Sequence, residues 1–150
     1  MPSTAHILRE TARILTRQGL HTGSQFAGPS VGFSSLDGPL DVCAAIYVAA
    51  TGKGPAEFQR DELASIRLIE CSAPAMQAIR AISDALDSEP SMDQLDRGVE
   101  VPNRIEHVSN WASTRAVGEK TPPTADEVIG RILRTADALD SQSAPHANAA

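Results

Sequence analysis

The sequence predicts an all-α protein, a single-domain compact bundle of five to six helices with a Gly/Ser/Pro-rich loop after the first helix. Its 150 residues suit one domain that buries a core of its own. Apolar residues make up 41% of the chain but aromatic residues only 3%, so alanine and aliphatic side chains must fill that core. Closely packed helices use such residues better than a β-sandwich, which draws on aromatic and β-branched side chains.

The first helix is expected over residues 4–18, where apolar side chains recur at helical spacing and Gly19 provides the stop. Residues 21–39 then predict a long loop or a short hairpin, in which residues 31–33 are the only strand-like piece. Loops of this length in a compact domain often carry function or are flexible. The next helix, over residues 40–50, is apolar on nearly every side, which is typical of a central helix.

Two more helices are expected over residues 55–71, with proline in the first turn, and over residues 74–87. Both carry apolar side chains at the spacing of one buried helix face. After them, Ser91 and Gln94 have the spacing of a capping box, and Gly98 closes a short turn. This part of the chain therefore predicts helix, helix and turn.

The last two helices are expected to begin near Pro102 and at Thr124. Thr124 and Glu127 form a full capping box, the clearest helix start in the chain. We expect one domain over residues 1–140 and a disordered tail over residues 141–150.

Charge and composition argue against several classes of partner. The net charge is −6, and the thirteen Lys and Arg residues are scattered, whereas nucleic acids and anionic membranes both need a basic surface. No apolar run approaches the roughly 20 residues that span a bilayer. The start lacks the pattern of a signal peptide, so the cytoplasm is the expected location, and Cys43 and Cys71 are expected to be reduced core residues.

The chain carries none of the familiar motifs for a nucleotide, a phosphate, a catalytic serine or a catalytic zinc. Its four histidines, at positions 6, 21, 107 and 146, are too dispersed to predict a metal site. We therefore expect no cofactor and no metal.

A polar strip on the helix after Pro102 is the best candidate site. Asn103, His107 and Asn110 recur at i, i+4 and i+7, and Trp111 lies beside them. A histidine among amides and an indole can act as a general base or orient a ligand, so His107 is the candidate catalytic residue and the other three are candidate ligand-binding residues. The commoner explanation of such a strip is a solvated helix face whose tryptophan closes the edge of the core.

Two further residues are candidates for ligand binding. Tyr47 is either a core tyrosine or lines a pocket, and His21 is placed to reach a pocket mouth at the head of the glycine-rich loop. Asp37 and Asp41 bracket Gly-Pro, and a turn former followed by a helix N-terminal charge explains them more simply than a catalytic carboxylate pair.

Three stretches, "HILRETARILTRQGLHTG", "DVCAAIYVAATG" and "IEHVSNWASTRAVGEKTPPTADEVIGRILRTADAL", resemble an uncharacterised family of small all-helical actinobacterial and phage proteins. That family has a Cys-Ala-x-Gly-Ala helix, then Trp-Asn-Asp and a Thr-x-x-Glu-Val helix. Cys43, Trp111 and Thr124 agree with this pattern, but Ile46 replaces the glycine and residues 112–113 replace Asn-Asp with Ala-Ser. The resemblance implies an all-α fold and brings no established activity.

The chain keeps the helices of the family pattern but replaces its polar Asn-Asp pair, which suggests that the same fold serves a different function here. We expect binding of a small organic molecule in an apolar pocket, with cofactor-independent cyclisation, isomerisation or dehydration in an actinobacterial biosynthetic pathway as the favoured activity. The alternative is a non-catalytic helical interaction or regulatory protein that acts as a homodimer. An enclosed apolar cavity would favour the first function, and an exposed apolar patch the second.

Overall fold

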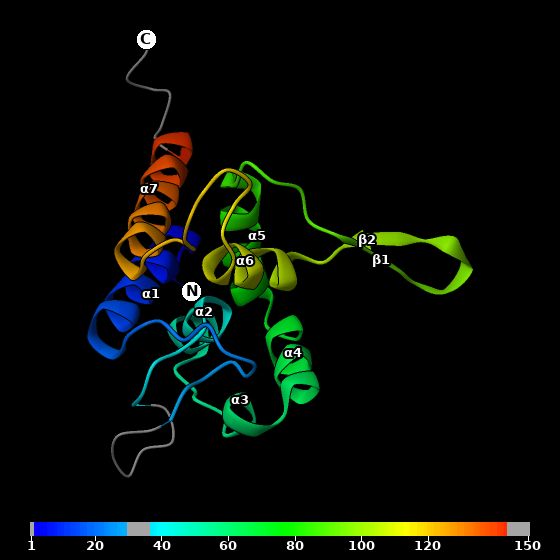
Figure 1. The fold of residues 1–150 in the computed structure, drawn as a ribbon, viewed down its shortest axis with the longest axis horizontal. Coiled ribbons are helices and arrows are strands. Elements are labelled where there is room, and N and C mark those ends of the chain that lie inside the picture. The colour runs from blue at the N-terminus through cyan, green and yellow to red at the C-terminus, as the bar shows by residue number, and fades with distance from the viewer. Residues whose placement is uncertain (1, 30–36, 144–150) are drawn as a thin grey trace.

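The computed structural model describes residues 2–29 and 37–143 (Figure 1). This part of the chain is mostly helical, as the sequence predicts, but it also contains a small two-stranded sheet that the sequence analysis missed. The elements in chain order are α1 (Thr4–Gln18), α2 (Val42–Thr51), α3 (Glu57–Arg60), α4 (Glu62–Glu70), α5 (Ala73–Ala85), β1 (Met92–Gln94), a 3-10 turn (Asp96–Gly98), β2 (Glu100–Pro102), α6 (Arg104–Ser113) and α7 (Ala125–Ser143).

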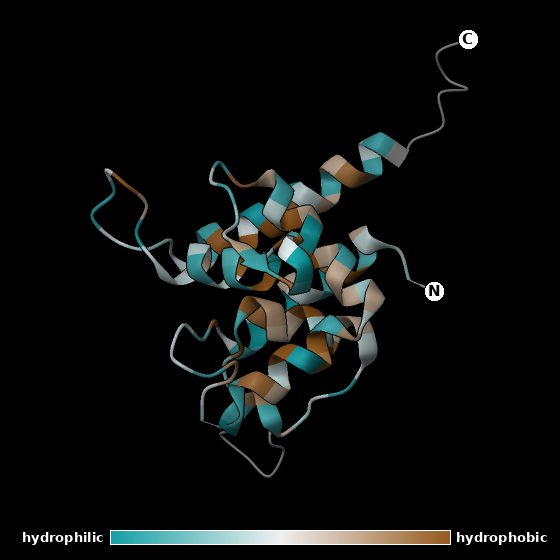
Figure 2. Cartoon of the chain, turned by 90° about the vertical axis from the view of Figure 1, so that its right-hand side faces the viewer, coloured by the Kyte–Doolittle hydropathy of each residue, from teal (hydrophilic) through white to brown (hydrophobic). Residues whose placement is uncertain are grey.

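Helix α2 lies at the centre of the body, as its apolar sequence predicts. Its residues from Val42 to Tyr47 are all buried, and α1, α5 and α6 pack against it. Helix α7 lies alongside α1 on the outer side of the body (Figure 1). In Figure 2 the hydrophobic residues gather in the interior, where burial of each Leu or Ile side chain contributes about 1.5–3 kcal/mol.

A cap begins α1, and an ion-pair network joins α1 to α7. The hydroxyl of Ser3 accepts the backbone N–H of His6 at the start of α1. The guanidinium of Arg9 contacts the carboxylates of Asp137 and Asp140 on α7 at 2.9 and 2.6 Å. Since these groups are largely exposed, they set the alignment of the two helices more than they stabilise the fold.

The helix expected over residues 55–71 is broken at Asp61 into α3 and α4. Asp61 has an extended backbone (φ −142°), and its carboxylate accepts the N–H of Ala64 at 3.0 Å. Aspartate is a favoured helix N-cap, so it begins a new helix inside a stretch whose apolar spacing reads as continuous. The expected core position of Cys71 is also wrong, because this residue follows the end of α4 and is exposed.

The turn expected near residues 92–98 is a β-hairpin. Strands β1 and β2 pair antiparallel with Gln94 opposite Glu100, and the N–H of Leu95 donates to the carbonyl of Val99 at 2.7 Å. Arg97 and Gly98 both adopt the left-handed conformation, with φ of 68° and 74°, which closes the loop between the strands.

The described ends of the glycine-rich loop fold back onto the start of α2. Leu20 and Ala27 both form bridges with Leu40, and the N–H of Asp41 donates to the carbonyl of Phe26 at 2.8 Å. The strand-like piece at residues 31–33 lies outside the described residues. The loop therefore places residues 22–26 beside the first turn of α2.

The structure confirms Thr124 as the N-cap of α7, since the N–H of Glu127 donates to the Thr124 hydroxyl at 3.2 Å. The Glu127 carboxylate returns a contact to that hydroxyl at 3.3 Å. The helix continues to Ser143, three residues into the expected tail, and residues 144–150 of that tail lie outside the described part. Within the described part, every helix is too short or too polar to cross a bilayer.

Candidate functional site

A buried carboxylate marks the start of α2. Asp41 is 8% exposed, and its Oδ2 accepts the backbone N–H of Cys43 at 2.8 Å, which makes it the N-cap of the helix. The same oxygen accepts the hydroxyl of Ser109, from α6, at 3.1 Å. The predicted role of Asp41 as a helix N-terminal charge is confirmed, but the carboxylate also joins two helices that are distant in sequence.

Asp41 lines a cavity of about 270 Å³ between three parts of the chain. Residues 22–26, which we call the strap, form one wall, and one face of α6 forms another. Glu62, the first residue of α4, adds a second carboxylate. Most of the lining side chains are polar and uncharged: Thr22, Ser24, Gln25, Ser109, Asn110 and Ser113.

The electrostatics of the site centre on Asp41. Burial raises the pKa of its carboxyl to about 6, although hydrogen bonds from the N–H of Cys43, the hydroxyl of Ser109 and the N–H of Ala44 pull the pKa partly back. A carboxyl with this pKa exchanges its proton near neutral pH, whereas an ordinary aspartate is almost fully ionised there.

Cys43 lies behind this carboxyl and is fully buried. Its thiol contacts the carbonyl of Ile105 at 3.6 Å and the hydroxyl of Ser109 at 3.5 Å. Burial, followed by the neighbouring charge of Asp41, raises the pKa of the thiol well above its ordinary value. Cys43 therefore stays protonated at neutral pH and acts as part of the wall rather than as a nucleophile.

Gln25, another residue that lines this cavity, carries a buried acceptor without a partner. The Oε1 atom of Gln25, on the strap, is buried, and no donor among the described residues reaches it. Leaving a buried polar atom unsatisfied costs about 1–3 kcal/mol, so native proteins rarely keep one without water or a ligand. Gln25 and Asp41 thus bring two hydrogen-bond acceptors to the lining of one small cavity.

His21 lines an adjoining hollow on the other side of the strap, which shares Gly23, Ser24 and Gln25 with the Asp41 cavity. Burial lowers the pKa of His21. Its imidazole lies close to two glycines, because a Cβ on Gly23 would come within 2.8 Å of the ring and one on Gly28 within 3.0 Å. These glycines leave room for the histidine beside the site.

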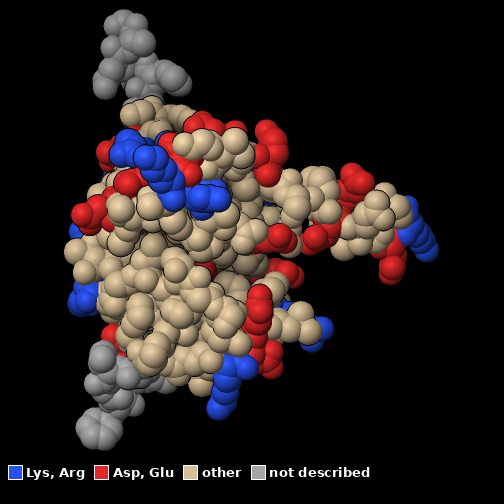
Figure 3. All heavy atoms as spheres, in the orientation of Figure 1, with Lys and Arg blue, Asp and Glu red and all other residues tan. Residues whose placement is uncertain are grey.

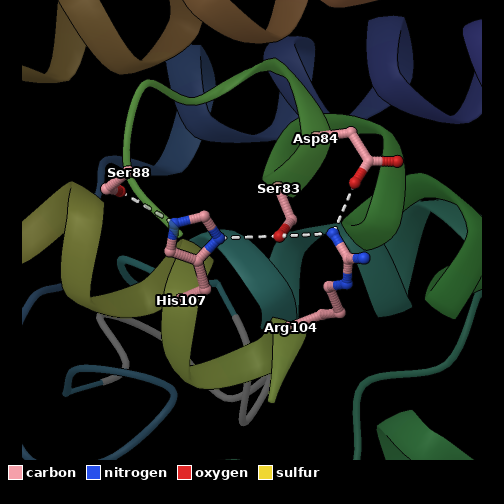
Figure 4. Close-up of polar contacts among 5 residues, drawn as sticks. All are labelled: Ser83, Asp84, Ser88, Arg104 and His107. Carbon is pink, nitrogen blue, oxygen red and sulfur yellow. Dashed lines mark hydrogen bonds and ion pairs between the residues drawn. The ribbon is translucent and has the colours of Figure 1, made fainter. Parts of the chain in front are cut away.

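His107, the candidate catalytic residue, is buried in a hydrogen-bond network away from that cavity (Figure 4). Its Nδ1 lies 2.6 Å from the hydroxyl of Ser83, and its Nε2 lies 2.8 Å from the hydroxyl of Ser88. Arg104 extends the network, since its Nη1 donates both to Ser83 at 3.1 Å and to the carboxylate of Asp84.

Serine hydroxyls hold both nitrogens of the His107 ring. Arginine only donates, so the Ser83 oxygen accepts from Arg104 on one lone pair, and its contact with Nδ1 of His107 uses either its hydrogen or its second lone pair. The contact of Nε2 with Ser88 fixes the other side of the ring. With both ring nitrogens occupied, the described geometry fits a histidine that holds α5, α6 and the segment after α5 together.

The other predicted site residues do not converge on one cavity, although Asn103 and Asn110 both donate to the carboxylate of Glu106. Asn103 caps α6 by accepting the N–H of Glu106 at 3.0 Å. Trp111 is half-buried at a separate hollow beside α7, and Tyr47 packs edge-on against Phe58 with ring centroids 5.4 Å apart. Of the six candidates, only Asn110 lines the cavity that contains Asp41.

Sequence reasoning missed Gln25 and Ser109, and it favoured a structural role for Asp41 over a catalytic pair with Asp37. The cap position of Asp41 was readable from the sequence, but its burial was not. Ser109 carried no signal, because its contact with Asp41 joins positions 68 residues apart. Among the described residues, no group of three or more His, Cys, Asp or Glu side chains is arranged to hold a metal ion.

Comparison with known proteins places the chain in a family. Residues 1–138 match a family described as "Family of unknown function (DUF6197)". No curated protein and no solved structure matched the sequence. Since the match spans nearly the whole chain, the protein belongs to this family of unknown function, DUF6197.

Proposed function

We propose that the protein binds a small polar molecule in the cavity between the strap and α6, with Asp41 as its anchor. The observation that carries this proposal is the buried carboxyl of Asp41 in the same lining as the unpartnered Oε1 of Gln25. A ligand that supplies hydrogen-bond donors would add to the partners of the buried Asp41 carboxyl and would give Gln25 Oε1 the partner that it lacks.

The charges of the lining point to a class of ligand. Asp41 and Glu62 are acidic, and the described residues that line this cavity include no Lys, Arg or His. A protonated amine or a guanidinium group matches two carboxylates and an amide oxygen, since it offers several N–H donors and a positive charge. The surrounding hydroxyls suit a small ligand with further polar groups.

Asp41 is also the group best suited to cofactor-independent catalysis. A carboxyl with a pKa of about 6 can take up and return a proton near neutral pH, as isomerisation or dehydration requires. The sequence analysis expected an apolar pocket, whereas this cavity is largely polar. The proposal therefore rests on hydrogen bonding and proton transfer more than on shape.

The remaining expectations stay part of the proposal. To act as a catalytic base, His107 would have to give up one of its two contacts with serine hydroxyls. We therefore assign the role of the base to Asp41. His21 is kept as a ligand-binding residue at the adjoining hollow. We further propose that the protein acts in cytoplasmic biosynthesis and that its family occurs in actinobacteria and phages.

The test is a binding experiment with small cations. Isothermal titration with methylguanidinium and ethanolamine, and with urea as a neutral probe, should show binding of at least one cation to the unmodified protein. Asp41→Asn should weaken that binding by about tenfold or more, because it removes the charge while keeping a capping residue. Gln25→Leu should weaken it less, since it removes a single neutral acceptor.

The matched control is Asp61→Asn, which changes another helix-capping aspartate outside this cavity. It should leave binding of the cation unchanged. If no cation binds, or if Asp61→Asn weakens binding as much as Asp41→Asn, the proposed function is wrong.

A second function, self-association, is favoured by a different observation. The hairpin formed by β1 and β2 projects from the body and exposes three large apolar side chains. No residue of this hairpin lines the Asp41 cavity.

A further inference from the structure

The hairpin of residues 92–102, which we call the arm, is a surface without a partner within the described chain. It projects from the body on the side away from α1 and α7 (Figure 1). All three β1 residues are exposed, and Met92, Leu95 and Val99 are 50, 53 and 53% exposed. Large apolar side chains gathered on one projection mark a surface that another molecule covers.

The arm is too short to be a stable hairpin by itself. Its strands are three residues long, and a lone two-stranded hairpin is at best marginally stable in water. Its base is tied down, since the N–H of Asn103 donates to the carbonyl of Ser91 at 2.8 Å. The apolar residues near its end have no such support, so a docked surface would stabilise the arm.

The charge of the arm restricts what can cover it. Three carboxylates, on Asp93, Asp96 and Glu100, accompany a single guanidinium, that of Arg97. Figure 3 shows acidic groups along the arm and one basic group at its far end. A surface that accepts the arm should therefore be basic and have an apolar floor.

Two hollows on the body have apolar floors and similar volumes of about 440 Å³. The first, on α4, contains Leu63 and Leu68, but its charged residues are Glu57, Asp61 and Arg67. The second lies between α1 and α7, and we call it the arginine groove. It is lined by Ala12, Ile129 and Leu133 together with Arg9, Arg13 and Arg17.

The two hollows have similar volumes but differ in the charge of the residues that line them. The α4 hollow is bordered by more acid than base and would repel the arm, whereas every charged residue that lines the arginine groove is an arginine. Arg9 is already paired with α7, and Arg13 with Glu10. Within the described part of the chain, Arg17 has no ion-pair partner and is the cation most available to an incoming carboxylate.

We propose that the arm of one copy docks into the arginine groove of a second copy. Met92, Leu95 and Val99 would cover the apolar floor while Asp96 and Glu100 face the arginines. The arm points away from α1 and α7, so a copy offers its arm and its groove to different neighbours (Figure 1). The association is therefore head-to-tail rather than a reciprocal dimer.

Charge reversal tests this pairing. One variant carries Arg13→Glu with Arg17→Glu, so that arm and groove are both acidic. A second carries Asp96→Lys with Glu100→Lys, so that both are basic. The unmodified protein should sediment with an apparent mass above that of the monomer, and this mass should increase with concentration. Each variant alone should associate at least about tenfold more weakly than the unmodified protein. An equal mixture should regain association, because each arm then meets a groove of opposite charge.

Leu63→Ser is the matched control, since it changes a leucine in the α4 hollow that is 60% exposed, against 53% for Leu95 on the arm. It should leave association unchanged, whereas Leu95→Ser on the arm should weaken it. A monomer at every concentration overturns the proposal. So does a mixture that stays monomeric, or a loss of association in Leu63→Ser. Circular dichroism of each variant separates loss of association from loss of folding, and the mixture does so independently. Cation binding at Asp41 plays no part in these outcomes.

Discussion

The hydroxyl of Ser109 donates a 3.1 Å hydrogen bond to the carboxylate of Asp41 and so connects α6 to the first turn of α2. One acidic side chain thereby caps the central helix, joins it to a second helix and lines a cavity. Because the group is buried, its protonation state affects both the stability of the fold and any ligand bound beside it.

Asp41 should make stability depend on pH in a particular direction. Its folded pKa of about 6 lies above the ordinary 3.8, so the fold favours the protonated form. The contribution is fully present below about pH 4 and is lost as the pH rises to about 6, a change of up to about 3 kcal/mol. Urea unfolding of the unmodified protein and of Asp41→Asn, compared across this range, should show the stability difference moving in favour of the variant as pH rises. If the free energies of unfolding of the two proteins changed in parallel with pH, that result would contradict the raised pKa of Asp41.

Loss of the Ser109 hydroxyl should raise the pKa of Asp41 further, because the charged carboxylate loses a donor. Ser109→Ala should also lower the free energy of unfolding at neutral pH by about 1–2 kcal/mol. Ser113→Ala is the control, since Ser113 lines the same cavity but donates to the backbone of its own helix. NMR titration of the Asp41 carboxyl carbon measures the pKa; equal values in both variants would remove Ser109 from the site.

His107→Ala should destabilise the fold by about 2–4 kcal/mol, because it opens a cavity and removes the ring partner of the buried Ser83 hydroxyl. Ser88→Ala removes only the exposed end of the network and should cost less than about 1 kcal/mol. Chemical denaturation measures both. A fully stable His107→Ala variant would show that the network does not hold α5 against α6.

The glycines around His21 should respond unequally to alanine. A Cβ on Gly28 would come within 2.7 Å of the Pro39 ring, which cannot move aside, so Gly28→Ala should cost about 1–3 kcal/mol. A Cβ on Gly23 would meet only the imidazole of His21, which can rotate away. The thermal unfolding midpoint of Gly28→Ala should lie well below that of Gly23→Ala. A lower midpoint for Gly23→Ala would contradict the described packing of the loop.

Helix periodicity and caps predicted most of the fold. The apolar residues of α2 marked a central helix, and the Thr124 cap located the start of α7. The break at Asp61 was hidden, because an aspartate among the polar residues of 57–62 reads equally well as an exposed position within one helix. The arm was missed because its strands are only three residues long, so the short alternation of Val99, Glu100 and Val101 is too brief to stand out as a strand.

The site was harder to predict, because it depends on contacts between distant segments. Periodicity placed Asn103, His107 and Asn110 on one strip of a helix, but it cannot say which element each side chain meets. In the structure Asn103 caps the helix, His107 meets two serines, and Asn110 lines the cavity of Asp41. The burial that changes the pKa of Asp41 arises only when the strap and α6 close over the start of α2.

The measurement that tests the central claim most directly is the pKa of the Asp41 carboxyl, followed by carbon-detected NMR without and with saturating methylguanidinium. The account predicts a pKa of about 6 in the free protein. It also predicts a decrease of about one unit or more in the bound protein, because a cation at the carboxylate favours the charged form. A free pKa near the ordinary 3.8, or a pKa that the cation does not change, would contradict the assignment of Asp41 as a ligand anchor.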